Sequence, residues 1–445
     1  MRSRLKVVYW NNMPSPYVVS RFNEVAQRDA FDFEAWFDGL READRSWAVD
    51  PSEWKFNARF IQGRRRLGHH KLVLPLAELR SSRPDVFICN YDRLHYVLGA
   101  IVGRSLARRT ALRCLPSFDA WTSPSRIRNL ARSFVFRAVD GAKVPGPDGS
   151  AYAGRYGLPI ERTWTVTQSI DVAHYAQARR MDSALRAQRR TELGVTGCVF
   201  IYVGRIWSGK GLDTLVSAYR KVRASNPDVS LLLVGDGPDQ QRLQAETSDL
   251  SDVVWAGFVQ PSQLPGIYNM ADVMVFPTLG DPNGLVVEEA MAAGLPVIST
   301  SAAGDIRARV PEGVAGYVVP PADPDALAVR MIELAGAPEL CAAMGNAGAH
   351  IADGFVTKAY ADDFEKFVYG VLAMPRRGGP STAFAQMVSR LVVTLPITLA
   401  RISAQEVRGN LPLIVRTADR SQEEPGSLTC WNMSALRSGV AIGVA

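Results

Sequence analysis

The sequence predicts an α/β protein in two halves, each built around a mainly parallel β-sheet. Short apolar runs alternate with longer amphipathic segments over residues 1–170, and the same alternation restarts at residue 196. Alternating strands and helices are typical of βαβ units, whose strands lie parallel. A polar, arginine-rich stretch at 176–191 separates the two series. A chain of 445 residues is long enough for two such domains.

The first half contains the less regular of the two patterns. Its expected strands are Leu5–Trp10, Phe33–Phe37, Val86–Asn90, Ala111–Leu115, Gly141–Val144 and Thr163–Thr167. Its clearest helical patterns are Val18–Arg28 and Leu94–Arg108. These elements define a first domain over residues 1–170.

The second half has the same alternation with clearer turns between the elements. Its expected strands are Cys198–Val203, Val229–Val234, Val253–Ala256, Val273–Phe276 and Pro296–Thr300. Its expected helices are Gly211–Ala224, Pro238–Thr247, Gly284–Ala293 and Pro324–Ala335. We expect residues 171–195 to connect the domains and 196–354 to form the second domain. One more helix, Phe355–Leu372, lies in the segment 355–374.

No part of the sequence is typical of a membrane span. Spanning a bilayer takes about 18 apolar residues or more, whereas the longest candidate, Leu391–Ala400, is short and contains proline. The start of the chain has too few apolar residues for a signal peptide. We expect a cytoplasmic protein, either free or peripheral on the inner membrane face. The tail, 375–445, is interpreted as disordered, as a membrane-surface element, or as an extension without function.

The net charge of +7 and the pI near 9.2 come mainly from clustered arginines. An anionic membrane surface, a nucleic acid or a phosphorylated substrate would suit such a charge, and ordinary solvated helix faces are the alternative. Nucleic-acid motifs are absent from the sequence, so we rank the membrane surface first and expect no nucleic-acid partner. The five cysteines and five histidines lack metal-ligand spacing, and Asp323-Pro324-Asp325 is interpreted as a helix cap. We therefore expect no metal.

A loop with two cations follows the first strand of the second half. It contains Gly204, Arg205, Lys210 and Gly211, and it leads into a helix. Arginine binds phosphate oxygens through its fork, and lysine adds a mobile point charge. A diphosphate site needs both cations, whereas a purely structural βα loop needs only the glycines. The glycine spacing is not that of a P-loop.

A second loop, Phe276 to Gly284, leads into the helix that carries two glutamates. Free N–H groups at Gly284, Leu285 and Val286 would form an anion site at the start of this helix. Asp281 precedes the helix and Glu289 lies about one turn inside it, so the two carboxylates would accept hydrogen bonds from sugar and ribose hydroxyls. Adjacent helical residues point about 100° apart. We therefore place Glu289 in the site and treat Glu288 as solvated.

Two further loops fall at the same carboxyl edge of the predicted sheet. Gly235-Asp236-Gly237 follows one strand, and Gly257-Phe258-Val259 follows the next. Ligands bind at this edge in open α/β folds. Gly235 would allow close approach of a nucleotide, and the backbone of Phe258 and Val259 would contact the base.

This order of motifs resembles glycosyltransferase family 4, the group 1 glycosyltransferases. The resemblance covers residues 5–372 and is most specific from Tyr202 to Ser299. It implies the GT-B fold: two Rossmann-like domains facing a cleft, with a C-terminal helix that crosses back to the first domain. It also implies a retaining enzyme whose catalytic residues are Arg205 and Lys210 on the donor diphosphate, with Asp281 and Glu289 on the donor sugar and ribose. The family usually has Glu where Asp281 stands.

The first half matches the family less well. Asn12, Ser15 and Tyr17 lie in a proline-containing loop that resembles the acceptor-side loop of one branch, and a structural turn is the alternative. The glycine pair and the histidine found in many members are missing. Asp119 is the candidate acceptor contact in the region where that histidine would lie.

The resemblance implies transfer of a hexose from a nucleotide-diphosphate sugar, of UDP or GDP type, to a glycan or lipid-linked acceptor. The nucleotide sugar is a co-substrate, and no further cofactor is expected. Cell-surface polysaccharide synthesis is the implied setting. Three alternatives remain at this point. They are a sugar phosphorylase or epimerase on the same fold, a regulatory protein with a relic donor pocket, and a nucleic-acid-binding module.

Overall fold

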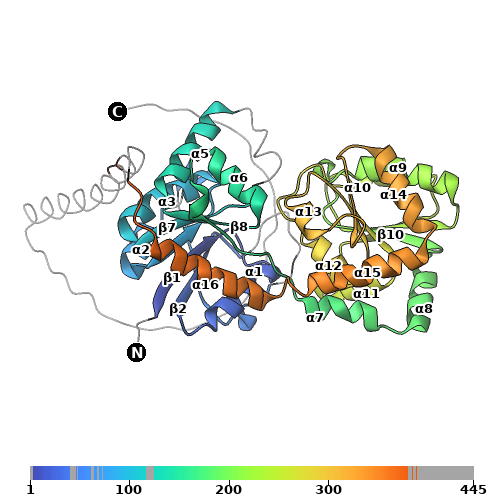
Figure 1. The fold of residues 1–445 in the computed structure, drawn as a ribbon, viewed down its shortest axis with the longest axis horizontal. Coiled ribbons are helices and arrows are strands. Elements are labelled where there is room, and N and C mark those ends of the chain that lie inside the picture. Colours follow the sequence, from blue (N-terminus) through green and yellow to red (C-terminus); the bar gives the residue numbers. More distant parts are fainter. Residues whose placement is uncertain are drawn as a thin grey trace, which may run out of the picture. The chain divides into compact units, whose positions relative to one another are not determined.

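The computed structural model describes most of the chain. The described residues are 4–40, 47, 49–61, 65–67, 70–72, 74–116, 125–378, 383 and 387. They form two parallel sheets with helices on both faces of each (Figure 1). This confirms the predicted α/β class.

The first sheet has seven strands in the order β3-β2-β1-β6-β7-β8-β9. The strands are β1 (Leu5–Asn11), β2 (Phe31–Phe37), β3 (Asn57–Phe60), β6 (Val86–Cys89), β7 (Arg109–Arg113), β8 (Gly141–Val144) and β9 (Thr163–Thr165). All neighbours pair in parallel. The sequence pattern did not predict the edge strand β3, because all of its residues are exposed and it has no apolar run. The pattern also missed a short antiparallel hairpin, β4 (Arg65–Leu67) and β5 (His70–Leu72).

The second sheet has six parallel strands in the order β12-β11-β10-β13-β14-β15. They are β10 (Cys198–Val203), β11 (Val229–Val234), β12 (Val253–Gly257), β13 (Val273–Phe276), β14 (Val297–Thr300) and β15 (Gly316–Val319). The first five agree with the predicted strands, and β15 was not predicted. In both sheets the order reverses beside the first strand of the domain, which is the doubly wound arrangement.

Helices cover both faces of the two sheets. The first domain contains α1 (Pro16–Ala26), α2 (Leu76–Ser82), α3 (Leu94–Leu106), α5 (Arg126–Ala138) and α6 (Pro147–Arg155). The second contains α9 (Leu212–Ser225), α10 (Gln240–Glu246), α11 (Leu264–Asn269), α12 (Val286–Ala292), α13 (Ile306–Arg309), α14 (Pro324–Ala335) and α15 (Pro338–Ala352). The sequence pattern did not predict α15, which is rich in alanine and glycine. Its Gly345 packs so closely on the Gly294 carbonyl that a Cβ would clash there.

The strands alternate between two apolar cores in each domain, as expected for parallel sheets buried on both sides. In β1, Tyr9 packs into the core under α1, whereas Trp10 packs into the core on the opposite face of the sheet. Both sheets belong to one compact unit of the chain, Met1–Leu395.

The residues between the two sheets are helical and pack on the second domain. They include α7 (Val172–Tyr175) and α8 (Ser183–Leu193). Arg186 and Arg190 of α8 both form ion pairs with Asp272, directly before β13.

The helix α16 (Thr357–Ala373) follows the second domain and packs on the first (Figure 1). Phe364, Phe367 and Val371 lie in the first-domain core beside Val7. This confirms the crossing helix implied by the resemblance. The chain after the helix is then fixed by arginines: Arg109 donates to the Met374 carbonyl at 2.8 Å, and Arg162 to the Pro375 carbonyl at 3.0 Å.

One buried ion pair connects this exit segment to the first domain. Arg104 and Asp140 are both fully buried, with 2.5 Å between Nη1 and Oδ1. Asp140 also accepts from the backbone N–H groups of Thr110 and Arg377. The carboxylate therefore satisfies three donors in the domain interior.

We predict that Asp140→Ala destabilises the fold by about 3–5 kcal/mol, because it leaves the Arg104 charge buried without a partner. The free energy of unfolding, measured in urea, tests this. Asp249→Ala is the control, since it removes an exposed partner of Arg220 and exposed ion pairs contribute little. Equal losses in both variants would contradict the prediction.

Candidate functional site

The loops predicted to bind a donor lie together at the carboxyl edge of the second sheet. The strand order reverses between β10 and β13, and open α/β sheets bind ligands at such a switch point. The loop after β10 carries Lys210, and the loop after β13 carries Asp281. The Leu279 N–H donates to the Gly209 carbonyl at 3.0 Å, so the two loops are in direct contact.

The loops after β11 and β12 join this edge through the backbone. Gly204 donates to the Val234 carbonyl at 2.9 Å, and Gly235 donates to the Gly257 carbonyl at 2.8 Å. Gly235 has a φ of 137°, and a Cβ there would clash with the Gly204 carbonyl oxygen. Only glycine permits this approach.

An ion pair between Lys210 and Asp281 joins the two central loops. Oδ2 of Asp281 pairs with the ammonium, and Oδ1 accepts from the N–H groups of Asn283 at 2.9 Å and Gly284 at 2.6 Å. Burial raises the pKa of Asp281, but Lys210 and these N–H donors outweigh burial and hold the pKa below its ordinary value. The site therefore keeps a carboxylate in spite of its burial.

Glu289 is fully buried and accepts hydrogen bonds from two tyrosines. Tyr17 of α1 donates to Oε1 at 2.5 Å, and Tyr268 of α11 donates to Oε2 at 2.8 Å. Burial raises the pKa of Glu289, and the tyrosine hydroxyls only partly oppose it. Tyr17 belongs to the first domain, so this carboxylate connects the two domains.

The expectation that Glu288 is solvated was wrong. Glu288 is fully buried and forms a bidentate ion pair with Arg309, at 2.5 and 2.6 Å. Arg309 also donates to the Gly284 carbonyl at 3.0 Å. The pair therefore supports the loop that contains Asp281. The helix α12 is packed on all sides from Val287 to Ala292, so both glutamates are buried although they point apart.

The other predicted donor-side residues lie on the same loops. Arg205 is partly exposed directly after Gly204, and its carbonyl accepts from the Tyr202 hydroxyl at 2.8 Å. Leu285 and Val286 begin α12 and are half-buried. Phe258 is exposed after β12, whereas Val259 packs against the core.

The first-domain residues divide into different roles. Ser15 is buried, and its hydroxyl accepts from the Val18 N–H as the N-cap of α1, the structural alternative. Asn12 is half-buried beside it. Tyr17 reaches Glu289, a contact that sequence spacing does not reveal. Asp119 lies outside the described residues.

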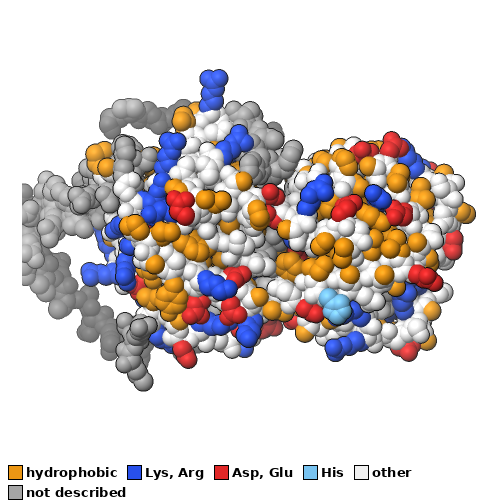
Figure 2. Space-filling model, in the orientation of Figure 1, with side chains coloured by type: hydrophobic (Ala, Val, Ile, Leu, Met, Phe, Trp, Pro, Cys, Tyr) orange, Lys and Arg blue, Asp and Glu red, His pale blue; other side chains and the backbone are white. Residues whose placement is uncertain are grey.

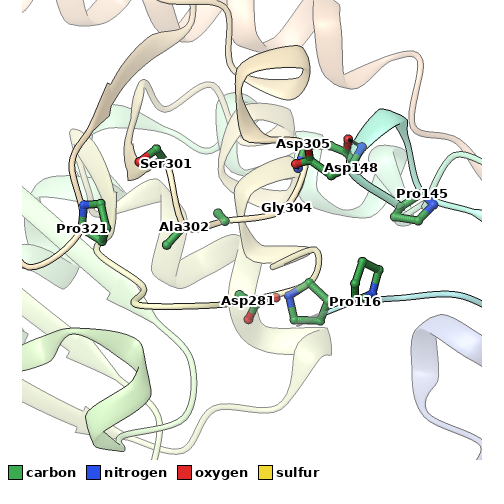
Figure 3. A pocket seen from close by; sticks show the side chains of 11 residues that line it. Pro116, Pro145, Asp148, Asp281, Ser301, Ala302, Gly304, Asp305 and Pro321 are labelled. Atoms are coloured by element: carbon green, nitrogen blue, oxygen red, sulfur yellow. Dashed lines mark hydrogen bonds between the residues drawn. The ribbon is translucent and has the colours of Figure 1, made fainter. Parts of the chain in front are cut away.

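A cavity of about 360 Å³ opens beside Asp281 (Figure 3). Pro116 and Asp148 line it from the first domain, and Asp281 and Asp305 from the second. Asp148 and Asp305 each accept the backbone N–H of the other at 2.9 Å. No local sequence pattern predicts this pair, because the two residues are 157 positions apart.

Metal ligands do not cluster anywhere in the part of the chain that the structure describes. Asp323 accepts from the N–H groups of Asp325 and Ala326 at the start of α14, which confirms its interpretation as a cap. None of the helices in the described ranges is long and apolar enough to cross a bilayer.

The two parallel sheets and the loops at their switch points define a two-domain, doubly wound α/β protein. Anabaena HepE in complex with UDP has a similar fold, with a TM-score of 0.67 and 16% identity over 82% of this chain and 99% of that one. Sucrose-phosphate synthase from Thermosynechococcus elongatus gives a TM-score of 0.64 and 21% identity, over 82% and 98% of the two chains.

The family follows from sequence. Residues 197–336 match the model described as glycosyl transferases group 1. A GDP-mannose-dependent phosphatidylinositol monomannoside mannosyltransferase of Mycolicibacterium smegmatis is 35% identical over 265 residues, which are 57% of this chain and 68% of that protein. A D-inositol 3-phosphate glycosyltransferase of Segniliparus rotundus is 34% identical over 206 residues, less than half of either chain at 44% each. This chain belongs to the group 1 glycosyltransferases.

We predict that the wild type loses stability relative to Glu289→Gln as the pH rises above 4.5, the ordinary pKa of a glutamate. A raised native pKa means that the folded protein binds more protons than the unfolded chain above the ordinary pKa of Glu, so stability falls as the pH rises from that value towards the native pKa. Glutamine carries no charge and lacks this loss. Urea unfolding at several pH values tests it, with exposed Glu246→Gln as the control. A stability difference that stays constant with pH would contradict the prediction.

Proposed function

We propose that this protein transfers a hexose, with retention at the anomeric carbon and without a metal, from a nucleotide-diphosphate sugar to a glycan or lipid-linked acceptor. The observation that carries the proposal is the Lys210–Asp281 pair at the β10/β13 switch point, with Arg205 on the same loop. Family membership supports the same chemistry.

In the proposed reaction the bond between the anomeric carbon and the donor diphosphate breaks, and the acceptor oxygen bonds to that carbon on the same face. Arg205 and Lys210 stabilise the charge that grows on the leaving diphosphate. Asp281 accepts from donor hydroxyls, and its ion pair fixes Lys210 near the phosphates. The acceptor proton passes to the leaving phosphate oxygen, which agrees with the missing histidine.

Two lines of comparison support a nucleotide-sugar donor and leave its base open between UDP and GDP. Solved neighbours of the same fold contain UDP, UDP with glucose, and UDP-glucose. The Mycolicibacterium relative is named as GDP-mannose-dependent. The names of two relatives include inositol compounds, one of them a phosphatidylinositol derivative, which favours a polyol or lipid-linked acceptor here. Cell-surface polysaccharide synthesis is the setting we propose.

An anionic membrane surface is the partner we propose for helix α5. Ile127 and Leu130 are 81% and 70% exposed, one turn apart on this helix. Arg126 and Arg128 flank them and are also exposed. Figure 2 shows Lys and Arg side chains gathered over this part of the first domain. An exposed apolar pair among arginines is typical of helices that lie on anionic lipid. This placement supports a peripheral location on the inner membrane face.

We predict that Lys210→Ala lowers the transfer rate about 100-fold or more, because the diphosphate loses a positioned cation. Calorimetry with UDP, GDP and ADP first identifies the nucleotide, and turnover of its common sugar conjugates is then followed. Lys221→Ala on the exposed face of α9 is the matched control. Wild-type turnover by Lys210→Ala would refute the site assignment. A folded wild type that binds none of the nucleotides would favour the relic-pocket alternative.

We predict that the double variant Ile127→Ser, Leu130→Ser binds vesicles containing phosphatidylglycerol about 30-fold more weakly than the wild type or weaker still, since two apolar contacts of about 1 kcal/mol or more each are lost. Co-sedimentation measures this. The control is Val329→Ser, Ile332→Ser on α14, an equally spaced exposed pair in the second domain. Equal binding by both double variants would exclude α5 as the membrane contact.

A further inference from the structure

The first sheet has its own switch point, lined by a row of polar side chains. The strand order reverses between β1 and β6. Asn11 ends β1, Asn90 follows β6, Arg113 ends β7 and Lys143 lies in β8, so four neighbouring strands each contribute one residue. We call these four residues the Arg113 row. They occupy the carboxyl edge of the sheet, where ligands of open α/β sheets bind.

The row contains two cations placed directly side by side. Arg113 and Lys143 are register partners on adjacent parallel strands. Like charges at such positions repel and destabilise a sheet. A third cation, Arg21 of α1, lies 5.4 Å from the ring centre of Tyr360, and the Lys143 ammonium lies 4.6 Å from the same centre. Arg21 and Lys143 therefore lie against the same tyrosine ring, and Arg113 is the strand neighbour of Lys143.

Among the described residues no carboxylate forms a direct ion pair with these cations, and the charge of Glu288 acts on Arg21 only from a longer distance. Lys143 donates to the Tyr360 hydroxyl at 3.0 Å, and Arg21 donates to Gln168 and Ser169. Burial lowers the pKa of Lys143 well below its usual range, and the charges of Arg113 and Arg21 lower it further. Ion pairs elsewhere in the described structure are frequent, so their absence here singles out the row.

Arg113 is the member of the row that an incoming anion would meet. It is partly exposed, whereas Lys143 is 3% and Arg21 5% exposed. Its Nη1 donates two long hydrogen bonds, each 3.4 Å, to the amide oxygens of Asn11 and Asn90. Within the described residues no other atom of its guanidinium has a protein acceptor, so most of the fork remains available.

We infer that the Arg113 row binds a phosphate group, a phosphate monoester carried by the acceptor. The guanidinium fork matches phosphate oxygens, and the charge of Arg21 adds to the attraction for an anion. An anion bound beside Lys143 would raise the pKa of that lysine and favour its charged form. The anion supplies a direct countercharge, which none of the described residues provides. Calling the ligand an acceptor rests on the proposed function, whereas the anion site itself does not.

Calorimetry on the full chain tests the site with inorganic phosphate, glucose 6-phosphate and glucose. We expect both phosphates to bind and glucose not to bind. Arg113→Gln should weaken phosphate binding at least tenfold, because charged hydrogen bonds are lost. Arg242→Gln removes one exposed positive charge from α10 and is the control. Unchanged phosphate affinity in Arg113→Gln would overturn the inference.

Asn90→Asp separates a ligand site from a structural cluster. The new carboxylate would lie beside Arg113 and supply a permanent countercharge there. We expect a higher Tm without phosphate, loss of phosphate binding, and loss of the stabilisation that phosphate gives the wild type. A variant that binds phosphate as the wild type does would overturn the inference.

Two further measurements distinguish the source of the phosphate and the role of the donor site. Vesicles of phosphatidylcholine with phosphatidic acid compete with glucose 6-phosphate if a lipid headgroup supplies the anion, and vesicles of phosphatidylcholine alone do not.

Nucleotide binding should remain unchanged in Arg113→Gln. If phosphate binding is lost in Lys210→Ala and kept in Arg113→Gln, the anion occupies the donor site and the inference fails. If phosphate binds at Arg113 and no nucleotide binds at all, the proposed transfer fails and the anion site stands.

Discussion

The ion pair between Lys210 and Asp281 is the contact on which the geometry of the second domain's site depends. It joins two loops that are 71 residues apart in the chain and adjacent only because β10 and β13 are neighbours in the sheet. The same carboxylate accepts hydrogen bonds from the N–H groups of Asn283 and Gly284. The Asp281 side chain therefore positions both the Lys210 ammonium and the backbone that leads into α12. A ligand that engages Lys210 therefore meets a preformed arrangement.

Support for this arrangement comes from beneath the loop. Arg309, which is paired with Glu288, donates a hydrogen bond to the Gly284 carbonyl. Glu289 accepts hydrogen bonds from the hydroxyls of Tyr17 and Tyr268. Both oxygens of Glu289 already accept a hydrogen bond from a tyrosine hydroxyl. In the proposed reaction a ribose hydroxyl that donates to Glu289 must therefore either share one of these oxygens with the tyrosine or displace the tyrosine hydroxyl from it. Since Tyr17 belongs to the first domain, donor binding would then be coupled to the contact between the domains.

Much of this arrangement follows from the sequence because it is set by topology. Parallel strands place their carboxyl ends at one edge, so Lys210 and Asp281 were predicted together from their positions after β10 and β13. Burial on all sides of a short helix has no such periodic signal, which is why Glu288 was assigned to solvent. The Tyr17–Glu289 contact spans 272 residues, and no local pattern records it. The helix α15 was missed because its small side chains serve close packing and weaken the apolar period.

The two switch points of the molecule differ in charge. In the second domain Lys210 is paired with Asp281 and Glu288 with Arg309. In the first domain Arg113 and Lys143 are neighbours, and no described carboxylate forms an ion pair with either of them. A group transfer between two bound molecules needs two sites of different chemistry. If the acceptor carries a phosphate, it brings a negative charge to the first site on binding, and the electrostatic attraction between that phosphate and Arg113 then contributes to the affinity of the acceptor.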